Sequence, residues 1–256
     1  MIRWIARPLG SVIARYLNGC IRGYEPFAIT DPHRLAKVLQ PADVLLVEGD
    51  RRVSTAIKYL TQSTWSHAAI YVGDRLDPDK DPLTARVLVE ADLEEGVVAV
   101  PLGKYAELNT RICRAVGLTP ETQRQVIDFV VARLGNHYDL KNVIDLARYL
   151  LPTPPVPVNW RRRMLALGSG DPTRAICSTL IAQAYQSIRY PILPHVERSA
   201  GVDKKLQTTV KEILHIRHYS LFAPRDFDIS PYFRVIKPTI EQHFDYQELR
   251  WADRAP

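Results

Sequence analysis

The sequence contains little cysteine and no long apolar run. Three cysteines occur in 256 residues, and none of them lies in a Cys-x-x-Cys pair. This number disfavours a disulfide framework and a cysteine-rich zinc site, and it is typical of a reducing compartment. No stretch approaches the roughly 18 to 20 apolar residues that a membrane-spanning helix needs. The sequence therefore predicts a globular protein with an ordinary hydrophobic core.

Nucleic-acid-binding signatures are also missing. There is no basic region with heptads, no zinc-finger spacing and no strand with RNP-like aromatics. The formal net charge of +6 is mildly basic and permits an acidic partner or an anionic membrane surface without requiring one. We therefore expect no nucleic-acid partner, and the sequence carries no signal for the oligomeric state.

The sequence shows neither an internal repeat nor a clear linker between two cores. A chain of this length commonly forms one domain around one core. We predict a single domain over residues 1–256, with its core at about 41–190, an N-terminal amphipathic helix at 1–22 and a C-terminal extension at 191–256.

The N-terminal segment has an apolar helical face and a basic character. Residues 1–22 contain four arginines and no acidic residue. The segment is interpreted either as a surface helix docked on the core or as an interfacial helix on an anionic membrane. Arginine and proline interrupt its apolar run, which makes it a poor secretory signal. We expect a cytoplasmic location, with peripheral contact to the inner face of the membrane through residues 1–22 as the alternative.

Short apolar runs separated by turn residues predict strands in the first half of the chain. These strands are expected at residues 42–48, 67–72, 86–91, 96–100 and 111–116, with one helix at 51–61. Their short connections favour an antiparallel sheet. Helices are expected afterwards, at 120–134, 140–150, 159–167 and 176–188. The predicted class is α+β, an antiparallel sheet packed against helices, with extra helical segments at both ends.

Cys177 is the candidate nucleophile. It lies at the start of the helix expected at 176–188, where free N–H groups and the helix dipole favour the thiolate, the attacking species. The alternative is a buried structural cysteine. Cys113 lies within an apolar strand and Cys20 in a loop, so both are weaker candidates.

A cysteine nucleophile needs a base and a group that orients the base. Of seven histidines, only His67 opens a strand, and it follows the polar approach Trp65-Ser66. Glu90 is a lone acid within an apolar strand, which indicates either a charge partner or a solvated strand face. Pairing of the two strands would bring His67 and Glu90 together.

Four segments together resemble a known family. They are Ala-Asp-Val-Leu-Leu at 42–46, Ser-His-Ala-Ala-Ile-Tyr-Val-Gly at 66–73, Val-Glu-Ala at 89–91 and Ile-Cys-Ser-Thr-Leu-Ile at 176–181. This series resembles the permuted papain-like enzymes of the YiiX/YaeF type, which are related to NlpC-like amidases and lecithin:retinol acyltransferase-like proteins. Histidine precedes cysteine here, as in the permuted branch. The resemblance spans about residues 41–190. Many members of the family are secreted, and this sequence departs from them in its poor signal segment.

The resemblance implies hydrolysis or transfer at an amide or ester carbonyl, without a cofactor or metal. Cys177 would form a thioester acyl-enzyme, His67 would be the base, and Glu90 would orient His67. The expected wall and oxyanion positions are Tyr71, Ser178 and Trp65, although packing is the commoner role for a tyrosine such as Tyr71.

Four functions remain open from the sequence. The first is a thiol amidase or peptidase acting on a peptide-like substrate. The second is a membrane-associated hydrolase or acyltransferase acting on an acyl lipid. The third is a non-catalytic binding module on the same scaffold. The fourth, a metal site at His215 and His218, rests on a His-x-x-His spacing that is common by chance.

Overall fold

A computed structural model describes most of the chain. The described residues are 19, 25–26, 29–78, 80–92, 95–137, 176–201, 209–215, 217–242, 244–245 and 247. The helices expected at 140–150 and 159–167 lie outside these residues. The helix expected at 1–22 also lies outside them, apart from Gly19.

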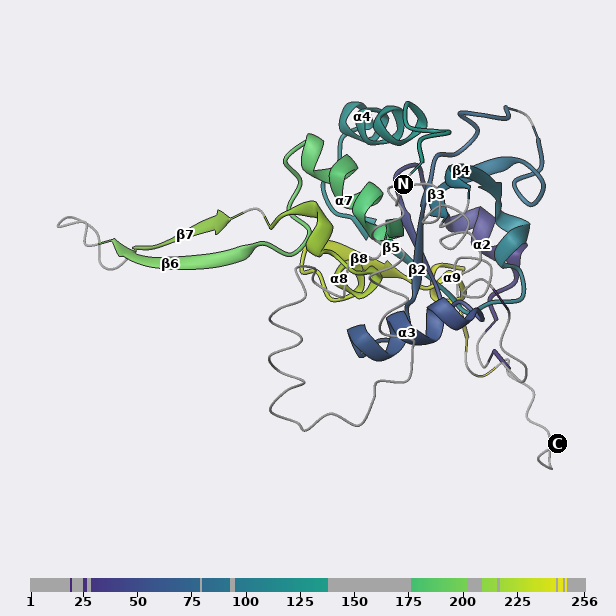
Figure 1. The fold of residues 1–256 in the computed structure, drawn as a ribbon, viewed down its shortest axis with the longest axis horizontal. Helices are drawn as coiled ribbons and strands as arrows, with labels where there is room; N and C mark the ends of the chain where they lie inside the picture. Colours follow the sequence, from purple (N-terminus) through teal and green to yellow (C-terminus); the bar gives the residue numbers. More distant parts are fainter. Residues whose placement is uncertain are drawn as a thin grey trace, which may run out of the picture.

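A six-stranded antiparallel sheet forms the centre of the described structure (Figure 1). Its strand order is β4-β3-β2-β1-β5-β8. The strands are β1 (Val44–Val47), β2 (His67–Tyr71), β3 (Arg86–Asp92), β4 (Gly96–Pro101), β5 (Thr110–Ala115) and β8 (Phe233–Ile236). The first five match the strands predicted from apolar runs, and all pairings are antiparallel. The α+β class is confirmed.

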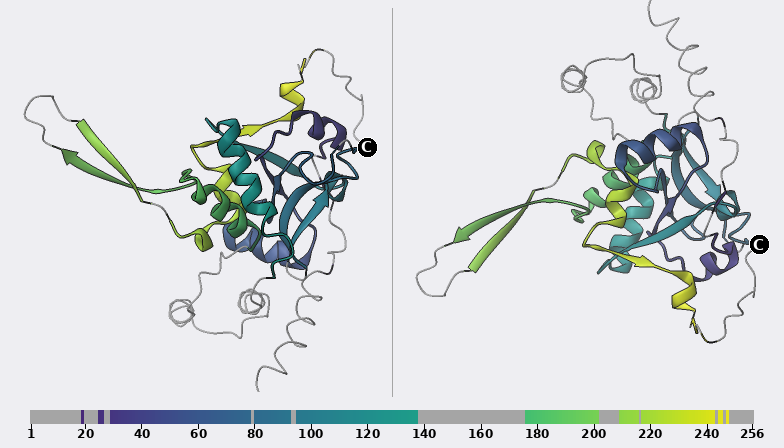
Figure 2. Two further views of the ribbon diagram at one scale, coloured as in Figure 1. Left: turned by 90° about the horizontal axis from the view of Figure 1, so that it is seen from above. Right: turned by 90° about the horizontal axis from the view of Figure 1, so that it is seen from below.

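Helices cover both faces of the sheet (Figures 1 and 2). The described helices are α2 (Pro32–Val38), α3 (Arg52–Thr61), α4 (Pro120–Val131), α7 (Ile176–Ser187), α8 (Pro224–Asp228) and α9 (Pro238–Glu241), with 3-10 turns η1 (Leu102–Tyr105) and η2 (Tyr219–Leu221). Buried residues of α4 and α7 belong to one apolar cluster with one face of the sheet. Those of α2 and η1 belong to the cluster on the other face. The sheet therefore separates two cores.

Strand alternation decides which side chains enter each core. Ala68 and Ile70 of β2 pack in the cluster beneath α7, whereas Ala69 and Tyr71 pack in the cluster beneath α2 and η1. The same alternation places His67 on the face shared by Ala69. A fully buried aliphatic side chain in such a core contributes about 1.5–3 kcal/mol.

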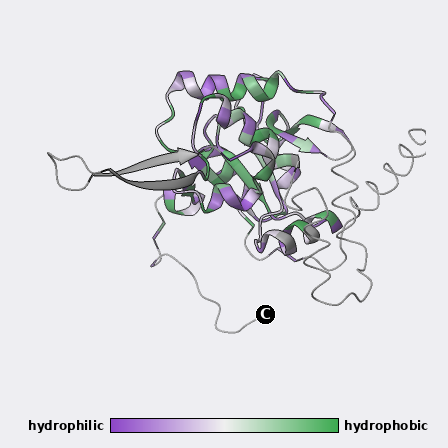
Figure 3. Cartoon of the chain, turned by 60° about the vertical axis from the view of Figure 1, so that its left-hand side comes forward, coloured by the Kyte–Doolittle hydropathy of each residue, from purple (hydrophilic) through white to green (hydrophobic). Residues whose placement is uncertain are grey.

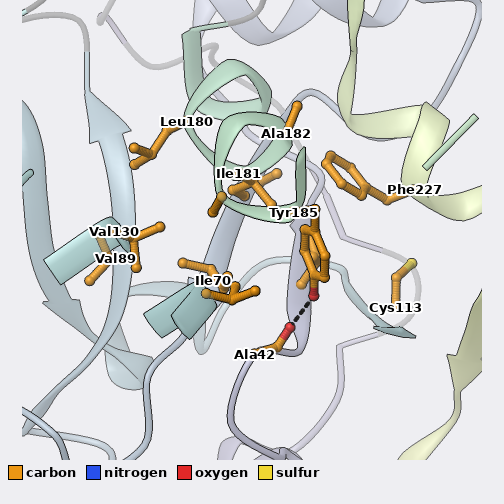
Figure 4. Close-up of a cluster of buried hydrophobic side chains, with 14 of the residues drawn as sticks. Ala42, Ile70, Val89, Cys113, Val130, Leu180, Ile181, Ala182, Tyr185 and Phe227 are labelled. Atoms are coloured by element: carbon orange, nitrogen blue, oxygen red, sulfur yellow. Dashed lines mark hydrogen bonds between the residues drawn. The ribbon is translucent and has the colours of Figure 1, made fainter. Parts of the chain in front are cut away.

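Helix α7 is fixed firmly on the sheet. Its Leu180 and Ile181 are fully buried beside Ile70 and Val89 (Figure 4). The hydroxyl of Tyr185 donates a hydrogen bond to the carbonyl of Ala42, just before β1 (Figure 4). These contacts anchor the helix that carries Cys177 and therefore position its N-terminus relative to the strands.

The C-terminal part of the chain contains more strand than the sequence predicted. Helices α8 and α9 lie there as expected, but β8 adds a sixth strand to the sheet by pairing with β5. In addition, β6 (His195–Gly201) and β7 (Thr209–His215) form a hairpin that projects from the body (Figures 1 and 2). The sequence did not predict β8, because a pairing between β5 and a strand so distant along the chain leaves no local pattern.

Hydrophilic and hydrophobic residues alternate around the helices that cover the sheet (Figure 3). This pattern is typical of helices that bury one face and expose the other. Within the described part of the chain, none of the helices combines the length and apolar character that crossing a bilayer requires.

Candidate active site

His67 and Glu90 meet across two neighbouring strands. The register of β2 and β3 places Ala69 opposite Glu90. His67 lies two residues before Ala69, so it is a diagonal neighbour of Glu90 on the same face of the sheet. Diagonal neighbours are within reach of long and aromatic side chains. The Nε2 atom of His67 lies 3.1 Å from Oε2 of Glu90.

Cys177 completes the cluster from a third element. It is the second residue of α7 and is 5% exposed. Its sulfur lies within hydrogen-bonding range of the His67 ring. Because Nε2 of His67 faces Glu90, Nδ1 is the ring nitrogen available to the sulfur. The structure thus brings together the three residues that the sequence singled out from distant segments.

The carboxylate of Glu90 is held by more than the imidazole. Its side chain is 1% exposed. Lys104 Nζ donates to Oε1 and the Tyr105 hydroxyl donates to Oε2, both from η1. Burial raises the pKa of Glu90, but the charge and hydrogen bond of His67, followed by those of Lys104, lower it to about 2. Glu90 is therefore ionised at neutral pH.

The imidazole of His67 lies between the Glu90 carboxylate and the Cys177 sulfur and is 23% exposed. Burial lowers its pKa, but the charges of Glu90 and then Cys177, together with their hydrogen bonds, raise it to about 10. The ring is consequently an imidazolium at neutral pH. Burial, and after it the charge of Glu90, raises the pKa of Tyr105 well above its ordinary value. Tyr105 therefore remains a neutral hydrogen-bond donor to Glu90.

Tyr71 packs in the apolar core rather than beside the cluster of titratable groups. Its side chain is 9% exposed, and it shares the core beneath α2 with Leu35 and Leu88. Burial, followed by the charge of Asp74, raises its pKa. These surroundings support the packing interpretation of Tyr71.

Ser178 is fully buried, and its hydroxyl donates a 2.6 Å hydrogen bond to the carbonyl of Phe222. This bond joins α7 to the segment that follows η2. A contact with substrate would require Ser178 to give up the bond, so the structure favours an anchoring role over the expected substrate contact.

Trp65 is buried and engaged on two sides. Its Nε1 donates to Asp228 at 3.1 Å. The guanidinium of Arg111 stacks on its ring, 4.8 Å from the centroid, and also binds Asp228 through Nη1 at 2.7 Å and 2.9 Å. Trp65 lines a pocket next to the strand that His67 opens. It therefore shapes the surroundings of the site without entering the hydrogen bonds of His67.

Lys104 and Tyr105 were not foreseen from the sequence. They follow β4 in a 3-10 turn whose residues carry no motif. The turn is held close to the segment before β3, because Gly103 N donates to the Leu83 carbonyl at 3.1 Å. A Cβ on Gly103 would lie 2.6 Å from that oxygen, so only glycine fits. This approach is tertiary, and sequence periodicity does not reveal it.

The described residues contain no group of three or more His, Cys, Asp or Glu side chains that could hold a metal ion. The side chain of His215, part of the alternative metal site, lies outside the described residues, whereas His218 is exposed and stacks on Tyr219.

The fold and the cluster define a class. The protein is an α+β protein in which a strand histidine, a strand glutamate and a later helix-start cysteine meet. Residues 38–149 match the family model described as "Permuted papain-like amidase enzyme, YaeF/YiiX, C92 family". The predicted resemblance is thereby confirmed over these residues, which include His67 and Glu90 and end before Cys177. The match supports an enzyme of the cysteine peptidase or amidase type.

Comparison with solved structures gave a weaker similarity. The crystal structure of the metalloprotein yiiX from Escherichia coli O157:H7 aligns with a TM-score of 0.45 and 15% identity. The alignment covers 77% of this chain and 96% of that chain. No curated protein matches this sequence significantly.

Proposed function

We propose that this protein is a thiol hydrolase that cleaves an amide bond through a thioester acyl-enzyme. Cys177 is the nucleophile, His67 transfers protons, and Glu90 orients His67. One observation carries the proposal: a single imidazole has a carboxylate on one ring nitrogen and a thiol within hydrogen-bonding range of its ring. The nucleophile, base and orienting group of a catalytic triad require this geometry.

The charges of the cluster suit the first step. An imidazolium beside the sulfur favours the thiolate, which is the attacking species. The thiolate of Cys177 attacks the amide carbonyl carbon, and a C–S bond forms. The N–H groups of the first helical turn have no partner within a helix. We propose that the backbone N–H of Cys177 donates to the developing oxyanion.

Proton transfer by His67 completes acylation. Imidazolium Nδ1 donates its proton to the leaving nitrogen, the C–N bond breaks, and the amine departs from a thioester on Cys177. Neutral His67 then takes a proton from water, whose oxygen attacks the thioester. The C–S bond breaks, a carboxylic acid leaves, and the imidazolium and thiolate return. Glu90 holds the ring throughout by accepting from Nε2–H.

Lys104 and Tyr105 support the orienting group. Both donate to the Glu90 carboxylate, so its oxygens have fixed partners and its orientation is defined. The positive charge of Lys104 also offsets part of the negative charge that holds the proton on His67. We therefore propose that Lys104 keeps the imidazolium acidic enough to release its proton to the leaving group.

Activity-based profiling with electrophilic peptidyl probes tests the proposal. A peptidyl acyloxymethyl ketone should label the wild-type protein at Cys177, as mapped by mass spectrometry of the digested adduct. Labelling should disappear in Cys177→Ala and persist in Cys113→Ala, the matched variant of a buried thiol whose pKa burial raises. A probe adduct on Cys113, with none on Cys177, would refute the assignment.

A further inference from the structure

A second polar site lies at the same end of the sheet as His67. It is a pocket of about 520 Å³, within the usual range of ligand pockets. Its walls come from five segments: Thr30 before α2, residues 62–65 after α3, residues 109–111 at the start of β5, α8 with Ile229, and residues 235–240 of β8 and α9.

The charge of the lining is positive. Arg111, Arg225 and Lys237 line the pocket together with a single acid, Asp228. The Asp228 carboxylate is already occupied, because Arg111 binds both of its oxygens and Trp65 donates to one. Arg225 donates to the backbone carbonyl of Thr61 at 2.5 Å. In the described part of the chain, neither Arg225 nor Lys237 forms an ion pair with a carboxylate.

The remaining lining combines hydroxyls with an aliphatic wall. Ser63, Thr64 and Thr239 contribute hydroxyl-bearing side chains. Ile229 and Ile240 line the pocket and are 51% and 60% exposed. Large aliphatic side chains with this much exposure are typical of binding surfaces when they cluster together. The pocket therefore suits a ligand with an anionic group and a small aliphatic part.

The pocket is close enough to the cluster to hold part of the same substrate. Val47 of β1 pairs with His67 on one side and with Thr110, a pocket residue, on the other. Register partners share a face of the sheet, and two strand spacings amount to about 10 Å. An extended peptide covers that distance in about three residues, at about 3.3 Å each.

We infer that this pocket binds a free carboxylate of the substrate, borne by a peptide-like chain with a small aliphatic side chain about three residues from the scissile carbonyl. Arg225 and Lys237 contact the carboxylate, and Ile229 and Ile240 contact the aliphatic group. The inference rests on the proposed function, since the distance runs from His67, beside which Cys177 would attack the amide.

Binding to the Cys177→Ala protein tests the inference without any turnover. The probes are N-acetyl-Ala-Ala, its C-terminal amide, and inorganic phosphate, each titrated by isothermal calorimetry and by backbone NMR shifts. N-acetyl-Ala-Ala should bind and shift the pocket residues. Its amide should bind at least tenfold more weakly, because a charge-assisted hydrogen bond is lost. Phosphate should bind weakly, because it has no aliphatic part.

Matched variants localise the effect. Arg225→Gln and Lys237→Gln should each weaken binding of N-acetyl-Ala-Ala about tenfold. Arg124→Gln removes an exposed cation on α4 and should leave the binding unchanged. The melting temperature of each variant verifies that it is folded. Equal affinity for the peptide and its amide, or for peptide and phosphate, overturns the inference. If Cys177 is not labelled by peptidyl probes but the peptide still binds through Arg225, the proposed function fails and the pocket stands.

Discussion

Replacing Glu90 by glutamine tests the electrostatics of the cluster. The pKa of His67 rises from 6.5 to about 10 although burial lowers it, and the charge of Glu90 is the largest single influence that raises it. A nearby opposite charge shifts a pKa by about 1–3 units. We expect the Glu90→Gln variant to lower the pKa of His67 by about 2 units, a roughly 100-fold loss of proton affinity.

The imidazole resonances of His67 report this change directly. A pH titration by two-dimensional NMR follows all seven histidines, and the signal missing in His67→Gln identifies the ring. Turnover of any substrate found should fall about 10²- to 10⁴-fold, as expected when proton transfer is impaired. Alkylation of Cys177 should still occur, because the thiol remains.

Two controls separate this electrostatic effect from loss of structure. Glu107→Gln removes an exposed acid just beyond η1 and should leave the His67 titration unchanged. In Glu90→Gln, the cation of Lys104 loses its carboxylate partner. Adding Lys104→Met removes that unpaired cation, so the double variant should be more stable than Glu90→Gln alone. A His67 pKa that stays near its wild-type value in Glu90→Gln would refute the reasoning.

Three further outcomes follow from the charges. Lys104→Met should raise the pKa of His67 further and slow release of the leaving group, which NMR titration and single-turnover kinetics measure. The stability that ionised Glu90 gives the wild type should be fully present above pH 4.5 and be lost as the pH falls through about 2. The stability that protonated His67 gives should be fully present below pH 6.5 and be lost as the pH rises through about 10. Urea unfolding should show neither pH dependence in the double variant Glu90→Gln with His67→Gln. If residues 1–22 form an interfacial helix, a larger fraction of the full chain than of a chain lacking these residues should float with anionic vesicles in a flotation assay.

Much of the fold follows from local patterns. Short apolar runs bounded by turn residues predicted β1 to β5 close to their observed limits. The start of α4 was also predicted, because Thr119 caps the helix and Pro120 occupies its first position. Such features act over a few residues, so a single sequence discloses them.

The candidate cluster followed from strand alternation together with helix position. Lone polar residues at His67 and Glu90 within apolar strands indicated partners, and Cys177 at a helix start indicated a reactive thiol. The contact of Lys104 and Tyr105 with Glu90 depends on how η1 folds back on β3, which no local pattern encodes. The pairing of β8 with β5 and the hydrogen bonds of Ser178 and Trp65 are equally non-local.

The central claim is that His67 activates the thiol of Cys177. The most direct measurement is the rate of iodoacetamide alkylation at Cys177 at neutral pH, followed by mass spectrometry in the wild type and in His67→Gln. We predict selective modification of Cys177 over Cys113 in the wild type, and a rate at least tenfold lower in His67→Gln. Equal rates at Cys177 in the two proteins, or faster modification of Cys113, would contradict the claim.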